Sequence, residues 1–263
     1  MSNENLEFMH NALKYLGFGE HTLLNQELED RVHEGAPDFQ LETEVSFDGE
    51  SRISARLYYH RSKNSLTDRY YLNKWEARLV YPGKPEKEAR KLFYIESSCR
   101  GVTFKQAFNL LQGRYVQRKV VDQNKEKHDW WLFLEPKMFG SDGYTYMRYI
   151  KYQFDLDKAL DKYPIRELSS PEARERLCTS LRRGNLQQVT FLHENGKTEP
   201  RLLYANPDKR LIGNVSMAAG AKQKKGSTYA ITELPEIDHP SGDAISESTL
   251  EEEPAQALKK AHL

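Results

Sequence analysis

The sequence predicts an α+β protein in which helices are followed by antiparallel meanders. Three observations predict it: short segments with apolar residues at helical spacing, runs that alternate polar and apolar residues between turn signals, and glycines at the junctions. Of the 263 residues, 38% are hydrophobic and 11% are aromatic. That content is enough to bury one or two ordinary cores, so we expect a protein folded over most of its length.

Residues 1–99 are predicted to form an N-terminal α+β region that begins with two amphipathic helices. The helical spacing is carried by two groups of apolar residues, Leu6, Met9, Leu13 and Leu16, then Leu24, Leu28 and Val32. Gly35 ends the second helix. The alternating segments that predict antiparallel strands are 39–47, 52–60, 70–81 and 90–97.

Residues 100–215 are predicted to be an α+β domain that holds two helix-glycine-meander units. The first unit begins with a capping box made by Thr103 and Gln106. Its amphipathic helix ends at Gly113, which we expect in the left-handed conformation. Its strands are predicted in 114–121, 128–135 and 144–150, with a breaker at 136–143.

The second unit of this domain follows a short helix predicted over 156–163, which Asp155 caps. Ser170 caps the next helix, with Pro171 as its first residue, and Gly184 ends it. Three further strands are predicted in 185–192, 200–206 and 209–215, with a tight Asn-Gly hairpin turn at 195–196.

The two units match each other when the sequence is shifted by 71 residues. The shift brings Leu110 and Gly113 onto Leu181 and Gly184. The layout of residues 22–80 is the same, so a degenerate repeat of three units is one interpretation. The other is that helix-then-meander is simply a common α+β layout.

The charges are distributed unevenly along the chain, although the net charge is zero. Lys and Arg number 13 against 17 Asp and Glu in 1–99, 24 against 14 in 100–230, and 2 against 8 in 231–263. The basic middle suits an anionic partner or an acidic tail that folds back on it. Residues 216–263 lack apolar periodicity, so we predict a disordered acidic tail.

Several function classes are disfavoured by the sequence. The longest apolar runs are strand-sized and the N-terminus lacks a signal-peptide pattern, so a cytoplasmic protein with no membrane partner is expected. Cys99 and Cys178 have no CxxC partner and are interpreted as buried hydrophobes. GKT at 196–198 lacks the earlier glycine of a phosphate-binding loop, because position 191 is Phe. We therefore predict no enzymatic activity, no cofactor and no metal.

Nucleic-acid binding is the function for which the residues themselves offer a candidate site. Alternation predicts Trp130 on the core side of its strand and Trp131 on the second face, where it could stack bases beside cations. The tentative site comprises Arg114, Arg118, Lys119, Lys125, Lys127, Trp131, Arg148, Arg182 and Arg183. The alternative is that Trp131 packs under a helix and the cations form a solvated rim. Strand 114–121 is primarily a sheet builder, because its counterpart 185–192 has no cation.

Three blocks of sequence, 101–116, 152–191 and 203–215, together resemble a known family. It is a domain of unknown function carried by proteins of conjugative and other mobile elements in gut anaerobic bacteria. The resemblance implies a mobile-element context near DNA-processing proteins, and it implies no activity. Our leading hypothesis is a protein-binding or scaffolding accessory protein. The alternative is a weak, sequence-tolerant binder of DNA or RNA that uses the basic residues of 100–230.

Overall fold

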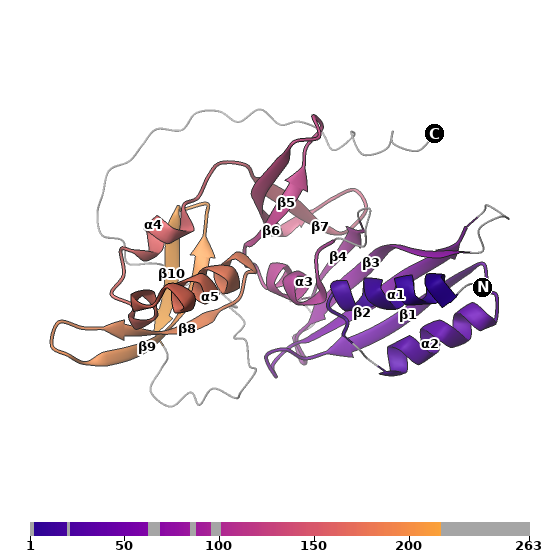
Figure 1. Ribbon diagram of the computed structural model, residues 1–263, viewed down its shortest axis with the longest axis horizontal. Coiled ribbons are helices and arrows are strands. Elements are labelled where there is room, and N and C mark those ends of the chain that lie inside the picture. The colour runs from indigo at the N-terminus through magenta and orange to yellow at the C-terminus, as the bar shows by residue number, and fades with distance from the viewer. Residues whose placement is uncertain (1–2, 20–21, 63–68, 85–87, 96–100, 217–263) are drawn as a thin grey trace. The chain divides into compact units, whose positions relative to one another are not determined.

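The structure of the protein, a computed structural model, describes residues 3–19, 22–62, 69–84, 88–95 and 101–216. Within these ranges lie five α-helices, one 3-10 helix and ten strands, which form three antiparallel sheets (Figure 1). The predicted α+β class is therefore confirmed. Cys99 and the predicted tail after Ser216 lie outside the described residues.

The first sheet has the strand order β1-β2-β3-β4 and follows two helices. The elements are α1 (Asn3–Tyr15), α2 (Thr22–His33), β1 (Asp38–Val45), β2 (Arg52–Arg61), β3 (Tyr70–Val80) and β4 (Ala89–Tyr94). Helix α1 contacts β3 and α2 contacts β1. These contacts bury the predicted apolar stripes of both helices. Trp75 on β3 is fully buried and packs edge-on against Phe18 at 5.2 Å between ring centroids.

The middle sheet follows one helix and has the strand order β5-β6-β7. Its elements are α3 (Phe104–Leu111), β5 (Val116–Val121), β6 (Lys127–Phe139) and β7 (Thr145–Ile150). The predicted capping box is present, since Thr103 and Gln106 exchange both side-chain-to-backbone hydrogen bonds. Gly113 has φ +76° just past the helix, as predicted. The predicted breaker is partly wrong, because β6 continues through Pro136 to Phe139 with an irregular register.

Both faces of the middle sheet are covered, and each contributes to a different hydrophobic core. Val116, Leu132 and Leu134 belong to the first core, together with α3 and the first sheet. Trp131 and Phe133, which point to the opposite face, belong to the second core. The first core therefore combines residues from both sides of the domain boundary that the sequence suggests between positions 99 and 100.

The third sheet has the strand order β10-β9-β8 and completes the described chain. Its elements and the helices before it are α4 (Leu156–Leu160), η2 (Arg166–Ser169), α5 (Pro171–Arg182), β8 (Gln187–Leu192), β9 (Thr198–Asn206) and β10 (Leu211–Ser216). The side chains of Asp155 and Ser170 cap α4 and α5 as predicted. Helix α4 is shorter than predicted, and the 3-10 helix η2 has no counterpart in the sequence analysis.

The middle and third meander units, residues 104–150 and 171–216, share their local geometry at the shift of 71 residues. Hairpin β5–β6 pairs Val116 with Leu132, and β8–β9 pairs Gln187 with Leu203. All six pairs of each hairpin keep this relation. Gly184 has φ +79°, matching Gly113. In the first meander unit, residues 22–80, Gly35 likewise has φ +72° and precedes its first strand by three residues, as Gly113 and Gly184 do.

Candidate functional site

The structure contradicts the predicted role of Trp131 as a base-stacking platform. Its side chain is 1% exposed in the second core, where it packs against Phe154 with 5.8 Å between ring centroids. Trp130 shares the face of Leu132 and Leu134, as predicted, but it lies toward the end of the sheet and is only half-buried. The physical reason is that alternation assigns residues to a face and does not say how far each face is covered.

Arg114 is also unavailable to a ligand, because it is 2% exposed. Its guanidinium donates to the side-chain oxygen of Asn109 and lies over the ring of Phe108 at 5.6 Å. Burial lowers the pKa of this guanidinium to about 9. The cation is therefore part of the interior, and its inclusion in a nucleic-acid site is wrong.

Three further predicted cations are engaged in contacts within the chain. Arg118 donates to the carbonyl oxygen of Gly101 and to Gln106. Arg148 binds Asp208 through two donors and Glu135 through Nε at 2.5 Å. Arg182 contacts Asp157 at 3.3 Å. Arg148 and Arg182 are therefore ion-paired and Arg118 is held by neutral oxygen acceptors, so all three are engaged within the chain and not with phosphate groups.

The other four predicted cations, Lys119, Lys125, Lys127 and Arg183, are exposed. The three lysines lie on or beside the β5–β6 turn, where Asp122, Glu126 and Asp129 alternate with them. The structure thus does not bring the nine predicted residues together into one basic surface.

A line of buried polar side chains connects the three meander units instead. Asp48, in the turn between β1 and β2, accepts a hydrogen bond from the amide of Gln112 at 2.8 Å. Asn109 donates from its amide to the carbonyl oxygen of Arg183 at 2.8 Å and to Asn185 at 2.9 Å. We call these contacts the inter-unit polar line; because buried polar groups need partners, it fixes how the units fit together.

Lys105 lies beside this line and has an unusual environment for a lysine. Its ammonium group is 4.2 Å from the ring centroid of Phe47 and 4.5 Å from that of Phe108. Burial, followed by the nearby charge of Arg114, lowers the pKa of Lys105 to about 7. The two rings stabilise the cation while desolvation disfavours it.

Asp157, in the first turn of α4, is favoured there by the helix dipole and also holds α5. Its carboxylate accepts from Arg174 at 3.1 Å and from the thiol of Cys178 at 3.4 Å. Burial, followed by this hydrogen bond, raises the pKa of the Cys178 thiol to about 11. Cys178 is therefore an inert buried side chain, as predicted.

The outer face of the first sheet is a polar surface that extends over its four strands, and sequence reasoning missed it. We define the outer face by its outward residues: Gln40, Glu42, Glu44, Ser54, Arg56, Tyr58, His60, Lys74, Glu76, Arg78, Arg90 and Tyr94. They alternate with buried residues of β1, β2 and β3. The alternation could have revealed this face, because its polar positions carry both aromatic and charged side chains.

Two shallow hollows lie on the outer face, each with a volume of about 390 Å³. The first is lined by Asp38, Phe39, Gln40, Tyr58, Tyr59, His60, Asn73 and Lys74. The second is lined by Glu42, Thr43, Glu44, Ser54, Ala55, Arg56, Glu76 and Arg78. Both span the same three strands, so they adjoin on one surface.

Charges on the outer face are paired and exposed. Arg56 contacts Glu42 at 2.6 Å, and Arg78 contacts Glu88 at 2.7 Å. Such exposed pairs contribute only about 0–1 kcal/mol to stability. They can therefore exchange partners at small cost when another charged surface approaches. Lys74 lies over the ring of Tyr58 at 5.3 Å.

No family model, no curated protein and no solved structure matches this chain. The resemblance to a domain of mobile elements consequently stays a prediction. None of the described helices is long and apolar enough to cross a membrane.

Proposed function

We propose that the chain is a non-enzymatic protein-binding module, and that the outer face of the first sheet binds the partner. The observation that carries the proposal is the composition of this face: the exposed ring of Tyr94 and the half-buried ring of Tyr58 lie among charges of both signs, on a surface with two adjoining hollows. Aromatic and Arg side chains are enriched at protein interfaces. Mixed charges suit a protein better than nucleic acid, which requires one sign.

The buried polar line supports the same function, because it serves rigidity. Asp48 and Asn109 each bond to a neighbouring unit: Asp48 accepts from Gln112, and Asn109 donates to the carbonyl oxygen of Arg183. A scaffold needs its units held in fixed positions, since ordering them on binding would weaken affinity. A cytoplasmic accessory role in a mobile element, which the sequence resemblance implies, is part of this proposal.

Cross-linking from defined positions tests the proposed surface. A photoreactive phenylalanine analogue replaces Tyr58 or Tyr94 on the outer face, and Tyr146 or Leu192 on the other sheets as controls. Tyr94 is 71% exposed, and the controls are each 43% exposed. After illumination in the native host, we expect one discrete adduct from the outer-face positions only.

Alanine variants then separate binding from mere proximity. Tyr58→Ala and Tyr94→Ala should reduce co-purification of the cross-linked protein at least tenfold, whereas Tyr146→Ala should not. Thermal unfolding of each variant verifies that the fold is intact. Equal adducts from all four positions, or none from the outer face, would disprove the proposed binding surface.

A second candidate function is weak binding of single-stranded nucleic acid, which one group of residues favours. Trp130 packs edge-on against Tyr149 at 6.1 Å and carries Lys151 over its ring at 5.1 Å. Tyr149 is 44% exposed. Exposed aromatic rings beside a cation can stack unpaired bases.

A salt titration discriminates the two functions. If nucleic acid is the partner, affinity for a labelled single strand should fall with a log-log slope of about −0.7 for each phosphate contacted. Trp130→Ala should then weaken binding while Tyr146→Ala does not. Under the leading proposal, neither single-stranded nor duplex nucleic acid binds measurably at 150 mM salt. This salt concentration is chosen because it screens weak surface contacts.

A further inference from the structure

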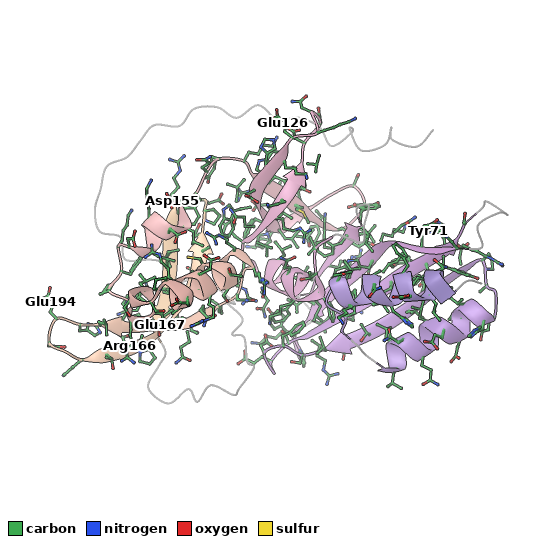
Figure 2. All side chains as sticks on the ribbon, viewed as in Figure 1. Tyr71, Glu126, Asp155, Arg166, Glu167 and Glu194 are labelled. Carbon is green, nitrogen blue, oxygen red and sulfur yellow. The ribbon has the colours of Figure 1, made fainter. Side chains whose placement is uncertain are left out.

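The turn between β5 and β6 holds three potential metal ligands in a defined arrangement. Asp122, Glu126 and His128 each offer one ligand atom, and these atoms all lie within 4.8 Å of one another. Figure 2 labels Glu126 at the tip of this hairpin, where it is accessible to solvent. The sequence predicts no metal at this turn, because the chain has no pair of histidines at zinc-ligand spacing.

Backbone hydrogen bonds orient the first ligand. One carboxylate oxygen of Asp122, Oδ1, accepts from the N–H groups of Asn124 and Glu126, both at 2.9 Å. The other oxygen, Oδ2, lies 2.9 Å from Nε2 of His128. The turn is closed by two backbone bonds, with Lys125 in the left-handed conformation at φ 65°. The Asp122 carboxylate is thus oriented by backbone N–H groups of its own turn, as hydrogen-bonded metal ligands commonly are.

The imidazole is also held in position. The ring of His128 stacks on that of Trp130 with 5.1 Å between centroids and 12° between planes. Its Nε2 atom lies 3.9 Å from Oε2 of Glu126. Bonds of about 2.0–2.2 Å to a tetrahedral zinc ion separate ligand atoms by roughly 3.4 Å. The two separations from His128, 2.9 Å to Asp122 and 3.9 Å to Glu126, lie on either side of that value, so side-chain shifts can bring these atoms to the spacing of ligands that share one zinc ion.

The equivalent turn in the third meander unit carries a different set of residues. At the shift of 71 residues, His193, Lys197 and Glu199 replace Asp122, Glu126 and His128. His193 and Glu199 keep an acid-imidazole contact at 3.2 Å, and Arg201 adds a bond to the same Glu199 at 3.0 Å. A hairpin turn of this shape therefore needs only one acid-imidazole pair, and the second carboxylate of the middle unit is not required for the turn.

The middle unit departs from that pair at two positions. A carboxylate, Glu126, stands where the third unit has Lys197, and an aromatic ring, Trp130, stands where it has Arg201. Both changes replace a cationic side chain of the third unit with one that carries no positive charge. They convert a charge-balanced pair into a group with two carboxylates and one imidazole.

We propose that Asp122, Glu126 and His128 bind one divalent transition metal ion of the zinc type. Imidazole and carboxylate ligands suit this ion, and water completes the four-coordinate shell. The bound ion fastens the tip of the β5–β6 hairpin. This inference is independent of the proposed partner surface, because it involves a different sheet.

Zinc titration of the full chain tests the site, with the two hairpins as matched controls. The wild type should bind one equivalent of Zn²⁺ in isothermal titration calorimetry, in buffer free of chelators. His128→Gln and Glu126→Lys should each weaken that binding at least tenfold. His193→Gln should leave it unchanged, although it removes the equivalent histidine.

A second readout keeps the test decisive. Cu²⁺ or Ni²⁺ bound at this site should quench the fluorescence of Trp130, so quenching should be lost in Glu126→Lys and retained in His193→Gln. Circular dichroism confirms that each variant is folded. The proposal is overturned if His128→Gln and His193→Gln lose zinc equally, or if the wild type binds no more tightly than His128→Gln.

Discussion

The middle and third meander units have the same backbone register, yet they use their shared positions differently. Arg114 and Asn185 are equivalent, and each donates from its side chain to the residue five positions earlier, Asn109 or Ser180. In the middle unit this donor is a buried cation, whereas in the third unit it is a neutral amide. The geometry of the turn is therefore conserved between the units while its electrostatic character is not.

The difference follows from what covers each unit. Helix α3 contacts both the first and the middle sheets, so the end of α3 and the residues after Gly113 are enclosed. The middle unit therefore binds polar groups of both neighbours. Gln112 donates to Asp48 of the first unit, and Asn109 donates to Asn185 of the third unit while it accepts from Arg114 of its own unit. In the third unit, Ser180 and Asn185 are only half-buried.

The largest expected effect is a difference in stability between alanine variants of the two left-handed glycines, Gly113 and Gly184. A Cβ atom on Gly184 meets the carbonyl oxygen of Tyr115 and a methyl group of Val116, both at 2.8 Å, whereas one on Gly113 meets nothing within 4 Å. Gly113→Ala should cost about 1 kcal/mol, from backbone strain alone. Gly184→Ala should cost roughly 3 kcal/mol, because the clash adds to the strain.

Urea unfolding of both variants measures the difference. The wild type and an exposed-site variant, Lys158→Ala, provide the reference. Equal costs for the two glycines would show that the third unit does not pack closely on β5.

Sequence reasoning predicted the features that depend on neighbouring residues. The caps at Thr103, Asp155 and Ser170 and the glycines past the helices were predicted correctly, because each is decided within about four positions. The inter-unit polar line was not predicted, since Asn109 and Asn185 are 76 residues apart. The pattern of polar and apolar residues along the chain does not indicate which distant polar side chains contact each other.

The failure at Trp131 has a different cause. Alternation correctly placed Trp130 and Trp131 on opposite faces of β6, but it carries no information on what lies above each face. Here both faces contribute to a core, so neither is the solvated side that an antiparallel sheet commonly has. The outer face of the first sheet does follow the common pattern, and its alternation was present in the sequence.

The next prediction tests whether the polar line is more important in the middle unit. Asn109→Ala removes the acceptor for Arg114 and the donor to the carbonyl oxygen of Arg183, and Asn109 and Arg114 are only 0% and 2% exposed. It should cost about 2–3 kcal/mol, because buried polar groups lose their partners. Ser180→Ala, at the equivalent position, should cost about 1 kcal/mol.

Denaturant unfolding again measures both values. Hydrogen exchange adds a local readout, since Asn109→Ala should also reduce protection of the amides in β8 and α5 if the line joins the units. Unchanged protection there would limit the role of Asn109 to its own unit.

The smallest effect concerns pH and the lysine beside the polar line. Lys105 has a pKa of about 7 in the folded protein, below the ordinary lysine value of 10.5. Between these pH values the unfolded chain binds more protons, so the free energy of unfolding contributed by Lys105 rises as the pH increases. Lys105→Met removes this dependence.

Urea unfolding at several pH values measures the effect. The amount by which the wild type is less stable than Lys105→Met should shrink between pH 7 and pH 10. Lys119→Met, an exposed control in the same unit, should run parallel to the wild type. Parallel curves for Lys105→Met as well would mean that Lys105 keeps its full charge in the folded protein, and that the rings of Phe47 and Phe108 compensate its burial.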